Sequence, residues 1–547
     1  MAWNYRGFER WLKPDSVPDE KHILVLPFTN VAGNEANQAF CDGLVEVLTS
    51  KLTQLEQFQG SLWVVPSAEV RKRSISSASE ANEQFGVNLV ISGSVQRSAD
   101  EIRLTMNLED PQKLRIINSV VLTETLAGVS DFQDNVIDRL SKMLEVKLLP
   151  QNRQVLAAGN TSVPKAFEYY LQGRGYLQNY TDSENIENAI HLFSQAIEED
   201  SLYALAYSGL GEAYFRKYQI NLENNLVQRA IRNCELALQL NDNLAPVYIT
   251  LGFIYSRTGK YEAAVKELER ALKIEPLNSD AHRLIADAYI KLNKLSYAEE
   301  TYRKAIELKP GYWDNYYRLG LFYLRTGSLD KAEKYLQKAV ELSPLNYRLY
   351  RDLGTAYFLM ERFQKAISAY SRSIDIEPNS ASYSNLGVLY SDQKDYRKAS
   401  KNFEKALELN NRQYVLWGNL AVCYSHLSDE RHKSKLTFEK AIQLAEQKLK
   451  VNPNDARVMT SLADYYIRVG QSEKSGSLIR RALILSPNDI DMVFRASEIY
   501  AMLGDPKKAL ILLEEAVSRG YSIDRIKKSP ALNSLHSNNR FKKLLLN

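Results

Sequence analysis

The chain has 547 residues, of which 45% are hydrophobic and 25% are charged. This balance is that of a folded globular protein, and it excludes a disordered or fibrous chain. The formal net charge of +4 is too small to indicate nucleic-acid binding, and residues 521–547 hold six basic side chains against one acidic side chain. We therefore expect no nucleic-acid partner.

Cysteines and apolar runs indicate the compartment. Cys41, Cys234 and Cys423 are far apart and form no CxxC pair, which argues against a disulfide framework and a zinc site and favours a reducing environment. The sequence contains no signal-peptide pattern and no run of 18 apolar residues. We expect a cytoplasmic protein without cofactor or transmembrane segment. The alternative is an extracytoplasmic location, if a membrane anchor precedes residue 1 in the native protein.

The N-terminal segment, residues 1–20, is rich in aromatic and basic side chains. These are Trp3, Tyr5, Phe8 and Trp11, with Arg6, Arg10 and Lys13. Such a mixture is typical of an interfacial segment beside a membrane helix. The alternative interpretation is a short helix that packs on the domain that follows.

Residues 21–149 alternate between short apolar runs and amphipathic stretches. The pattern predicts strands over 23–28, 62–65, 88–96, 101–108 and 115–123, and helices over 39–55, 79–85 and 131–146. The order βαβαβββα predicts a two-layer α/β domain. Residues 150–163, which include Gly159-Asn160-Thr161-Ser162, are predicted to be a linker.

Three motifs in this domain occur in a characteristic order. They are Val25-Leu-Pro-Phe28, Phe40-x-Asp42-Gly43-Leu44 and Val90-x-Ser92-Gly93-Ser94-Val95. With them, residues 21–149 resemble the N-terminal α/β domain of the TolB family. In bacteria this domain, followed by helical repeats, often forms the C-terminal part of serine/threonine kinases, adenylate cyclases or winged-helix transcription regulators. The resemblance therefore implies a bacterial signalling or regulatory module.

Residues 164–520 repeat one unit of about 34 residues. A small residue is followed three positions later by tyrosine at Gly252/Tyr255, Ala286/Tyr289, Gly320/Tyr323 and Gly354/Tyr357. A second signal, Ala264-x3-Leu268-x2-Ala271 followed by Pro276, recurs in the same register. Small residues let two helices approach each other, and proline ends the second helix. Such pairs must stack to bury their apolar faces, which predicts a solenoid.

This pattern resembles the tetratricopeptide repeat (TPR). The resemblance implies an all-α solenoid of about ten repeats over 164–520, with the tyrosines in the core, and residues 521–547 as a capping helix and basic tail. Together with the N-terminal domain, the fold class is α+β.

The sequence contains no motif that carries catalysis. Phosphate-binding loops, dinucleotide-binding glycines, kinase motifs and serine-nucleophile elbows are absent. Asp42 is interpreted as a carboxylate in the first turn of a helix, where the helix dipole favours an anion. The three cysteines are interpreted as buried structural thiols. We therefore expect a protein that is not an enzyme.

The TPR resemblance implies that the first helix of each pair lines an inner, concave face. Carried onto this sequence, the partner-binding candidates on that face are Arg283, Lys291, Tyr317, Arg325, Arg348, Arg351 and Phe358. Arginine binds carboxylates and aromatic rings provide apolar anchors, so an acidic peptide is the predicted ligand. The alternative is a solvated face in which Asp280, Asp287, Asp314 and Asp352 neutralise the arginines. The Lys-x3-Asn pair of chaperone-binding repeats is not found there, so chaperone tails are disfavoured.

The function predicted first is a non-enzymatic protein–protein interaction scaffold or adaptor. The alternative is the regulatory part of a bacterial signalling system that acts with a serine/threonine kinase, an adenylate cyclase or a transcription regulator. The identity of the partner and the oligomeric state do not follow from the sequence.

Overall fold

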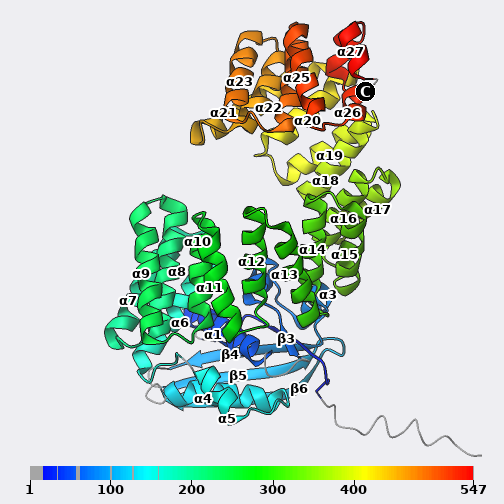
Figure 1. The fold of residues 1–547 in the computed structure, drawn as a ribbon. Coiled ribbons are helices and arrows are strands. Elements are labelled where there is room, and N and C mark those ends of the chain that lie inside the picture. The colour runs from blue at the N-terminus through cyan, green and yellow to red at the C-terminus, as the bar shows by residue number, and fades with distance from the viewer. Residues whose placement is uncertain are drawn as a thin grey trace, which may run out of the picture. The chain divides into compact units, whose positions relative to one another are not determined.

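A small sheet domain precedes a long series of helix pairs in the computed structural model (Figure 1). The structure describes residues 17–31, 33, 35–56, 62–98, 101–125, 129–157 and 159–545. The aromatic segment that contains Trp3, Tyr5, Phe8 and Trp11 lies outside these residues.

The sheet of the N-terminal domain is mixed. Its strands are β1 (Lys21–Val25), β2 (Thr29–Asn30), β3 (Leu62–Val64), β4 (Leu89–Arg97), β5 (Glu101–Asp110) and β6 (Arg115–Thr125). The order is β3-β1-β4-β5-β6, and β2 pairs with β4. The strands β1, β3 and β4 are parallel, with Leu24 opposite Val90, whereas β5 runs antiparallel to β4 and β6. The apolar runs in the sequence become the buried strands at the centre of this sheet.

Helices accompany the sheet. They are α1 (Glu35–Glu56), α2 (Ser67–Lys72), α3 (Ala78–Phe85) and α4 (Val129–Met143). Along β5, Ile102, Leu104, Met106 and Leu108 are buried in one core cluster with α1 and α4, while the residues between them are half-buried or exposed. This alternation shows that β5 is packed on one side. At the centre of the sheet both faces are covered, because Leu24 of β1 and Val90 of β4 are fully buried outside that cluster.

The predicted linker is partly wrong. Residues 150–163 contain the helix α5 (Pro150–Ala157), and Leu156 within it is buried in the core of the domain. Proline at the first position is compatible with a helix start, so Pro150 begins this helix instead of breaking the chain into a flexible segment.

The helix pairs follow the 34-residue repeat. The first helices are α6 (Pro164–Tyr176), α8 (Ala204–Asn221), α10 (Ala245–Arg257), α12 (Ser279–Lys291), α14 (Trp313–Arg325), α16 (Tyr347–Leu359), α18 (Ser380–Asp392), α20 (Tyr414–His426), α22 (Ala456–Arg468) and α24 (Ile490–Met502). The second helices are α7 (Ser183–Glu199), α9 (Asn224–Leu240), α11 (Tyr261–Ile274), α13 (Leu295–Leu308), α15 (Leu329–Leu342), α17 (Phe363–Ile376), α19 (Tyr396–Leu409), α21 (Arg431–Val451), α23 (Ser472–Leu485) and α25 (Pro506–Ser518). The chain forms two compact units, residues 1–346 and 347–547.

The repeated small residues permit close packing within each pair. A Cβ atom added to Gly320 would lie 2.8 Å from the Leu336 side chain, and one added to Gly354 would lie 2.7 Å from Tyr370. Tyr323 and Tyr357 are 1% and 7% exposed. The prediction that the repeat tyrosines belong to the core is therefore confirmed for Tyr323 and Tyr357, whereas Tyr255, Tyr289 and Tyr390 are half-buried.

Several repeat tyrosines also join one pair to the next. The Tyr323 hydroxyl on α14 donates a hydrogen bond of 2.6 Å to Glu299 on α13, and Tyr424 on α20 donates one of 2.7 Å to Glu404 on α19. Burial, reinforced by the bond to Glu299, raises the pKa of Tyr323 to about 12. Because the folded-state pKa lies above the ordinary value near 10, this bond stabilises the fold up to about pH 10 and loses its effect as the pH rises towards 12.

Replacing Tyr323 with phenylalanine should lower the free energy of unfolding by about 1–2 kcal/mol, because a hydrogen bond to a charged acceptor is lost. Urea unfolding of the variant measures this difference. Tyr255→Phe is the matched control, since Tyr255 holds the same repeat position and its hydroxyl makes no hydrogen bond within the described part of the chain. Equal losses in both variants would show that the bond to Glu299 contributes nothing.

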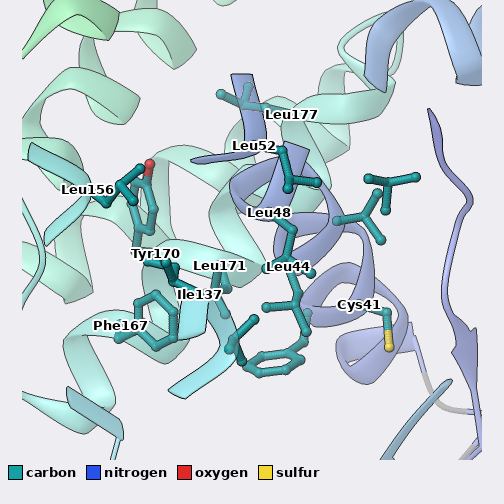
Figure 2. Packing of buried hydrophobic residues seen from close by; sticks show 14 of the residues in the cluster. Cys41, Leu44, Leu48, Leu52, Ile137, Leu156, Phe167, Tyr170, Leu171 and Leu177 are labelled. Atoms are coloured by element: carbon teal, nitrogen blue, oxygen red, sulfur yellow. The ribbon is translucent and has the colours of Figure 1, made fainter. Parts of the chain in front are cut away.

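The N-terminal domain packs directly on the first repeat. At the crossing of α1 and α6, a Cβ atom on Gly43 would lie 1.8 Å from the Leu171 carbonyl oxygen, and one on Gly175 would lie 1.8 Å from that of Ala39. The two helices thus touch through their backbones. Figure 2 shows Leu44 and Leu48 of α1 in one apolar cluster with residues of α4 and α6.

The same domain also rests on three successive loops between repeats. Glu275, Lys309 and Ser343 occupy equivalent positions, each immediately before the repeat proline. Glu275 accepts a hydrogen bond of 3.0 Å from Gln54, Lys309 forms an ion pair with Glu56, and the Ser343 hydroxyl donates to the Gln84 carbonyl. All three are buried, whereas the equivalent Glu377 of a later repeat is exposed. The N-terminal domain and the repeats up to residue 346 therefore form one folded body.

Candidate functional site

The predicted partner-binding residues fall on both compact units. Arg283 and Lys291 lie on α12, and Tyr317 and Arg325 lie on α14, all within the first unit. Arg348, Arg351 and Phe358 lie on α16 in the second unit. The structure thus places the first four on two successive repeats of one unit and the last three on one helix of the other.

In the first unit, Arg283 is already neutralised. Its guanidinium lies 3.1 Å from Asp280 and 3.8 Å from Asp287. Burial acts to lower the pKa of Arg283, but the carboxylates of Asp280 and Asp287 together outweigh it and raise the pKa. On the next repeat, the half-buried Arg318 pairs with Asp314 at 2.9 Å. These two arginines therefore agree with the alternative interpretation of the sequence, in which aspartates on the same face neutralise the arginines.

Lys291 and Arg325 differ from Arg283. Both are exposed at the last position of their helices, and neither has an ion-pair partner among the described residues. Arg257 ends α10 in the same way, so that the three cations are spaced by one repeat of 34 residues. We name Arg257, Lys291 and Arg325 the basic row.

Apolar side chains accompany the basic row. The Arg257 guanidinium lies 5.3 Å from the ring centre of Phe253, and Arg216 of the preceding repeat lies 4.9 Å from the same ring. Leu321, four residues before Arg325, and Tyr317 are half-buried. Arg257 and Phe253 were not among the predicted residues, although the 34-residue register counted back from Lys291 leads to Arg257.

The second-unit candidates lie in a more paired environment. Arg351 forms an ion pair of 2.7 Å with Asp352, and Arg348 donates to the Tyr347 hydroxyl at 3.3 Å. The half-buried Phe358 ring lies 6.2 Å from Phe363. The charge of Arg351 is therefore offset locally, as the alternative interpretation expects.

A cluster of charges joins α1, α6 and α8, and no sequence motif indicates it. Arg174 lies 2.8 Å from Glu212 and 3.1 Å from Glu46, and Arg216 lies 3.2 Å from Glu212. Burial acts to raise the pKa of Glu212, but Arg174 and Arg216 lower it to about 2. Since each carboxylate here is held by arginine, the cluster fastens the N-terminal domain to the repeats and offers no free acid or base.

The other chemical candidates are structural. Cys41, Cys234 and Cys423 are buried free thiols, and burial raises the pKa of each. Asp42 lies within α1, beyond its first turn, because the helix begins at Glu35, and it accepts a hydrogen bond of 2.9 Å from Gln38. Across the described ranges, no group of three or more histidines, cysteines and carboxylates is arranged to hold a metal. Nor is any described helix both long and apolar enough to cross a membrane.

Comparison with family models identifies the class of the repeats. Residues 222–288 and 257–319 match the tetratricopeptide repeat. Residues 311–528 match the C-terminal domain of cilia and flagella-associated protein 70. The chain therefore contains tetratricopeptide repeats, as its 34-residue period predicts.

Among curated proteins, a putative adenylate cyclase 3 of Rhizobium meliloti (strain 1021) is 25% identical to the chain over 199 residues. The match covers 36% of this chain and 33% of the cyclase. The chain thus spans about a third of the length of this relative.

Solved structures also resemble parts of the chain. MamA from Desulfovibrio magneticus RS-1 is 25% identical, covers 31% of this chain and 96% of its own, and has a TM-score of 0.28. A tetratricopeptide repeat protein from Parabacteroides merdae ATCC 43184 is 18% identical, with 47% and 99% covered and a TM-score of 0.36. YrrB, described as a TPR protein with an unusual peptide-binding site, is 25% identical, with 34% and 92% covered and a TM-score of 0.26.

Proposed function

We propose that the protein is a non-enzymatic interaction scaffold, and that the first helices of its N-terminal unit bind an acidic segment of a partner protein. The observation that carries this proposal is the basic row. Arg257, Lys291 and Arg325 stand exposed at one repeat position and have no ion-pair partner in the part of the chain that the structure describes, whereas Arg283 and Arg318 nearby are paired. Exposed cations one repeat apart suit a ligand with several carboxylates along its length.

The apolar residues beside the row supply the remaining part of such a site. Phe253, Tyr317 and Leu321 are half-buried and leave part of their side chains accessible. Because charged pairs at an exposed surface are screened by salt, the carboxylates would set the rate and specificity of binding while an apolar anchor adds affinity. The partner-binding set that we propose is therefore the basic row with Phe253, Tyr317 and Leu321.

Reversing the basic row should abolish this binding. In Arg257→Glu/Lys291→Glu/Arg325→Glu, affinity for a Glu- and Asp-rich peptide should fall at least about 100-fold at low salt, since three attractions become repulsions. Fluorescence anisotropy with a labelled acidic peptide measures the affinity, and wild-type binding should weaken as salt is raised.

A matched control lies on the second helices of the same repeats. Arg270, Lys304 and Lys338 are likewise exposed and spaced by 34 residues, and each pairs with a glutamate of its own helix. The variant Arg270→Glu/Lys304→Glu/Lys338→Glu makes the same change in net charge and should retain binding. If both triple variants lose binding equally, the peptide responds to net charge and the proposed site is wrong.

The second candidate function is regulation of a bacterial signalling enzyme. It is favoured by the TolB-like motifs of the N-terminal domain and by the partial similarity to a putative adenylate cyclase. In this interpretation the acidic ligand belongs to a kinase, a cyclase or a transcription regulator supplied by another chain in the cytoplasm. Adding the pure protein to such an enzyme should change its rate, and the change should disappear in the basic-row variant. An unchanged rate in every case would remove this candidate.

A further inference from the structure

The C-terminal segment closes the end of the repeats. It contains α26 (Ile523–Lys528), the short 3₁₀ helix η5 (Pro530–Leu535) and α27 (Asn539–Leu544). Ile526, Leu532, Leu535 and Phe541 are fully or almost fully buried in one core with α24 and α25. These residues cover the apolar face that a terminal repeat would otherwise expose.

The residues that flank α26 also contact the first helix α24. The Tyr521 ring stacks on Phe494 with 4.3 Å between ring centres and 18° between planes. The Ser529 hydroxyl donates a hydrogen bond of 2.6 Å to Glu498. In repeat register, Phe494 corresponds to Tyr317 and Glu498 to Leu321 of the first unit. On α24 the segment therefore covers the two positions that correspond to Tyr317 and Leu321, which on α14 belong to the proposed partner-binding set.

The basic side chains of α26 reach much further than a cap requires. Arg525 lies 3.9 Å from Asp491 on α24, and Lys528 lies 3.7 Å from Glu361 in the turn after α16. Burial raises the pKa of Asp392, at the end of α18, while Arg525 and Lys528 act to lower it. Glu361 and Asp392 belong to the first two helix pairs of this unit, whereas α26 follows the last pair. The segment thus extends from the end of the unit to its beginning.

We propose that α26 is an autoinhibitory segment, which occupies the first-helix face of the second unit in place of a basic helix from a partner protein. The chemistry of the occupant defines the partner. It is a short helix with cations on one side for Glu361, Asp392 and Asp491, and an aromatic ring for Phe494. The charged contacts are exposed and therefore weak and sensitive to salt, whereas Ile526 is fully buried. A partner that displaces α26 must therefore present an apolar side chain in place of Ile526 as well as the same charged groups. The inference is independent of the basic row, which lies in the first unit.

The test weakens the contact between α26 and the acidic groups of the second unit, and supplies the α26 segment as a separate peptide. The probe is a labelled peptide with the sequence of residues 519–530, and the variant is full-length Arg525→Glu/Lys528→Glu. The variant should bind the peptide at least about 10-fold more tightly than the wild type at low salt, because its own α26 no longer pairs with the acidic groups. Hydrogen exchange of the α26 amides should be at least about 10-fold faster in the variant.

Two further variants decide the outcome. Lys542→Glu/Lys543→Glu makes the same charge change on the exposed side of α27 and should behave as the wild type. Adding Glu361→Lys/Asp392→Lys to Arg525→Glu/Lys528→Glu should abolish peptide binding again. Equal peptide affinity in the wild type and in Arg525→Glu/Lys528→Glu, with unchanged exchange of α26, would overturn the proposal even if the acidic peptide still binds the basic row.

Discussion

Replacing Gly43 with alanine should lower the free energy of unfolding of the N-terminal unit by about 3 kcal/mol or more. The added methyl group would lie 1.8 Å from the Leu171 carbonyl oxygen, which is backbone and has no rotamer that relieves the clash. The helices α1 and α6 must then move apart, and the apolar cluster between them loses contact. Overpacking of a core typically costs about 1–3 kcal/mol, and a clash with backbone lies at the upper end of that range or above it.

Gly476→Ala is the control for helix propensity. Gly476 lies within α23, and a Cβ atom there would have no neighbour closer than 3.8 Å. Alanine should therefore stabilise that helix by about 0.5–1 kcal/mol. Urea unfolding followed by tryptophan fluorescence and by circular dichroism compares the variants. If Gly43→Ala unfolds at the wild-type urea concentration, the close crossing of α1 and α6 is not required for stability.

Replacing Lys309 with methionine should destabilise the same unit by about 3–5 kcal/mol. Glu56 is 0% exposed and also accepts a hydrogen bond of 2.7 Å from the Val64 amide, so the variant leaves a buried carboxylate without its counter-ion. Breaking a buried ion pair on one side has costs of this size. Lys304→Met, which removes an exposed pair with Glu307, should change stability by less than about 1 kcal/mol.

The pH dependence gives this prediction a sign. Burial raises the pKa of Glu56, and Lys309 acts to lower it, so the pKa should rise further in Lys309→Met. A folded-state pKa above the unfolded value means that the folded state gains stability as the pH falls through it. The penalty of Lys309→Met should therefore be largest near neutral pH and shrink in acid. The double variant Glu56→Gln/Lys309→Met should recover part of the loss at neutral pH. A penalty that is independent of pH would contradict the assignment to Glu56.

Much of the fold could be predicted because its signals are local. The strands at 89–97 and 101–110 are visible as alternating or continuous apolar runs. The helix pairs are visible in the spacing of Gly320, Tyr323 and their equivalents, because neighbouring repeats must present the same surface to each other. The helix α5 could not be predicted because its composition is typical of a loop. It is stabilised by Leu156, which is buried in the core of the N-terminal domain.

The candidate site could be predicted only in part. The repeat register placed Arg283, Lys291 and Arg325 on first helices, as the structure shows. Which of these cations is paired depends on side-chain geometry, and Arg283 turns towards Asp280 and Asp287 while Lys291 and Arg325 have no such partner among the described residues. Arg257 was omitted although the same register contains it. Whether the basic row binds a peptide stays a prediction.

The sequence by itself determined the helix pairs, the strands and the close packing at the repeated small residues, because these depend on residues that are near one another in the chain. Only the tertiary structure decided that the N-terminal domain rests on Glu275, Lys309 and Ser343, and that α26 extends towards Glu361. A repeat presents equivalent positions again and again, so the sequence does not indicate which copy will be covered. That choice depends on the contacts of segments distant in the chain, whose combined burial and charge pairing exist only after the helices have stacked.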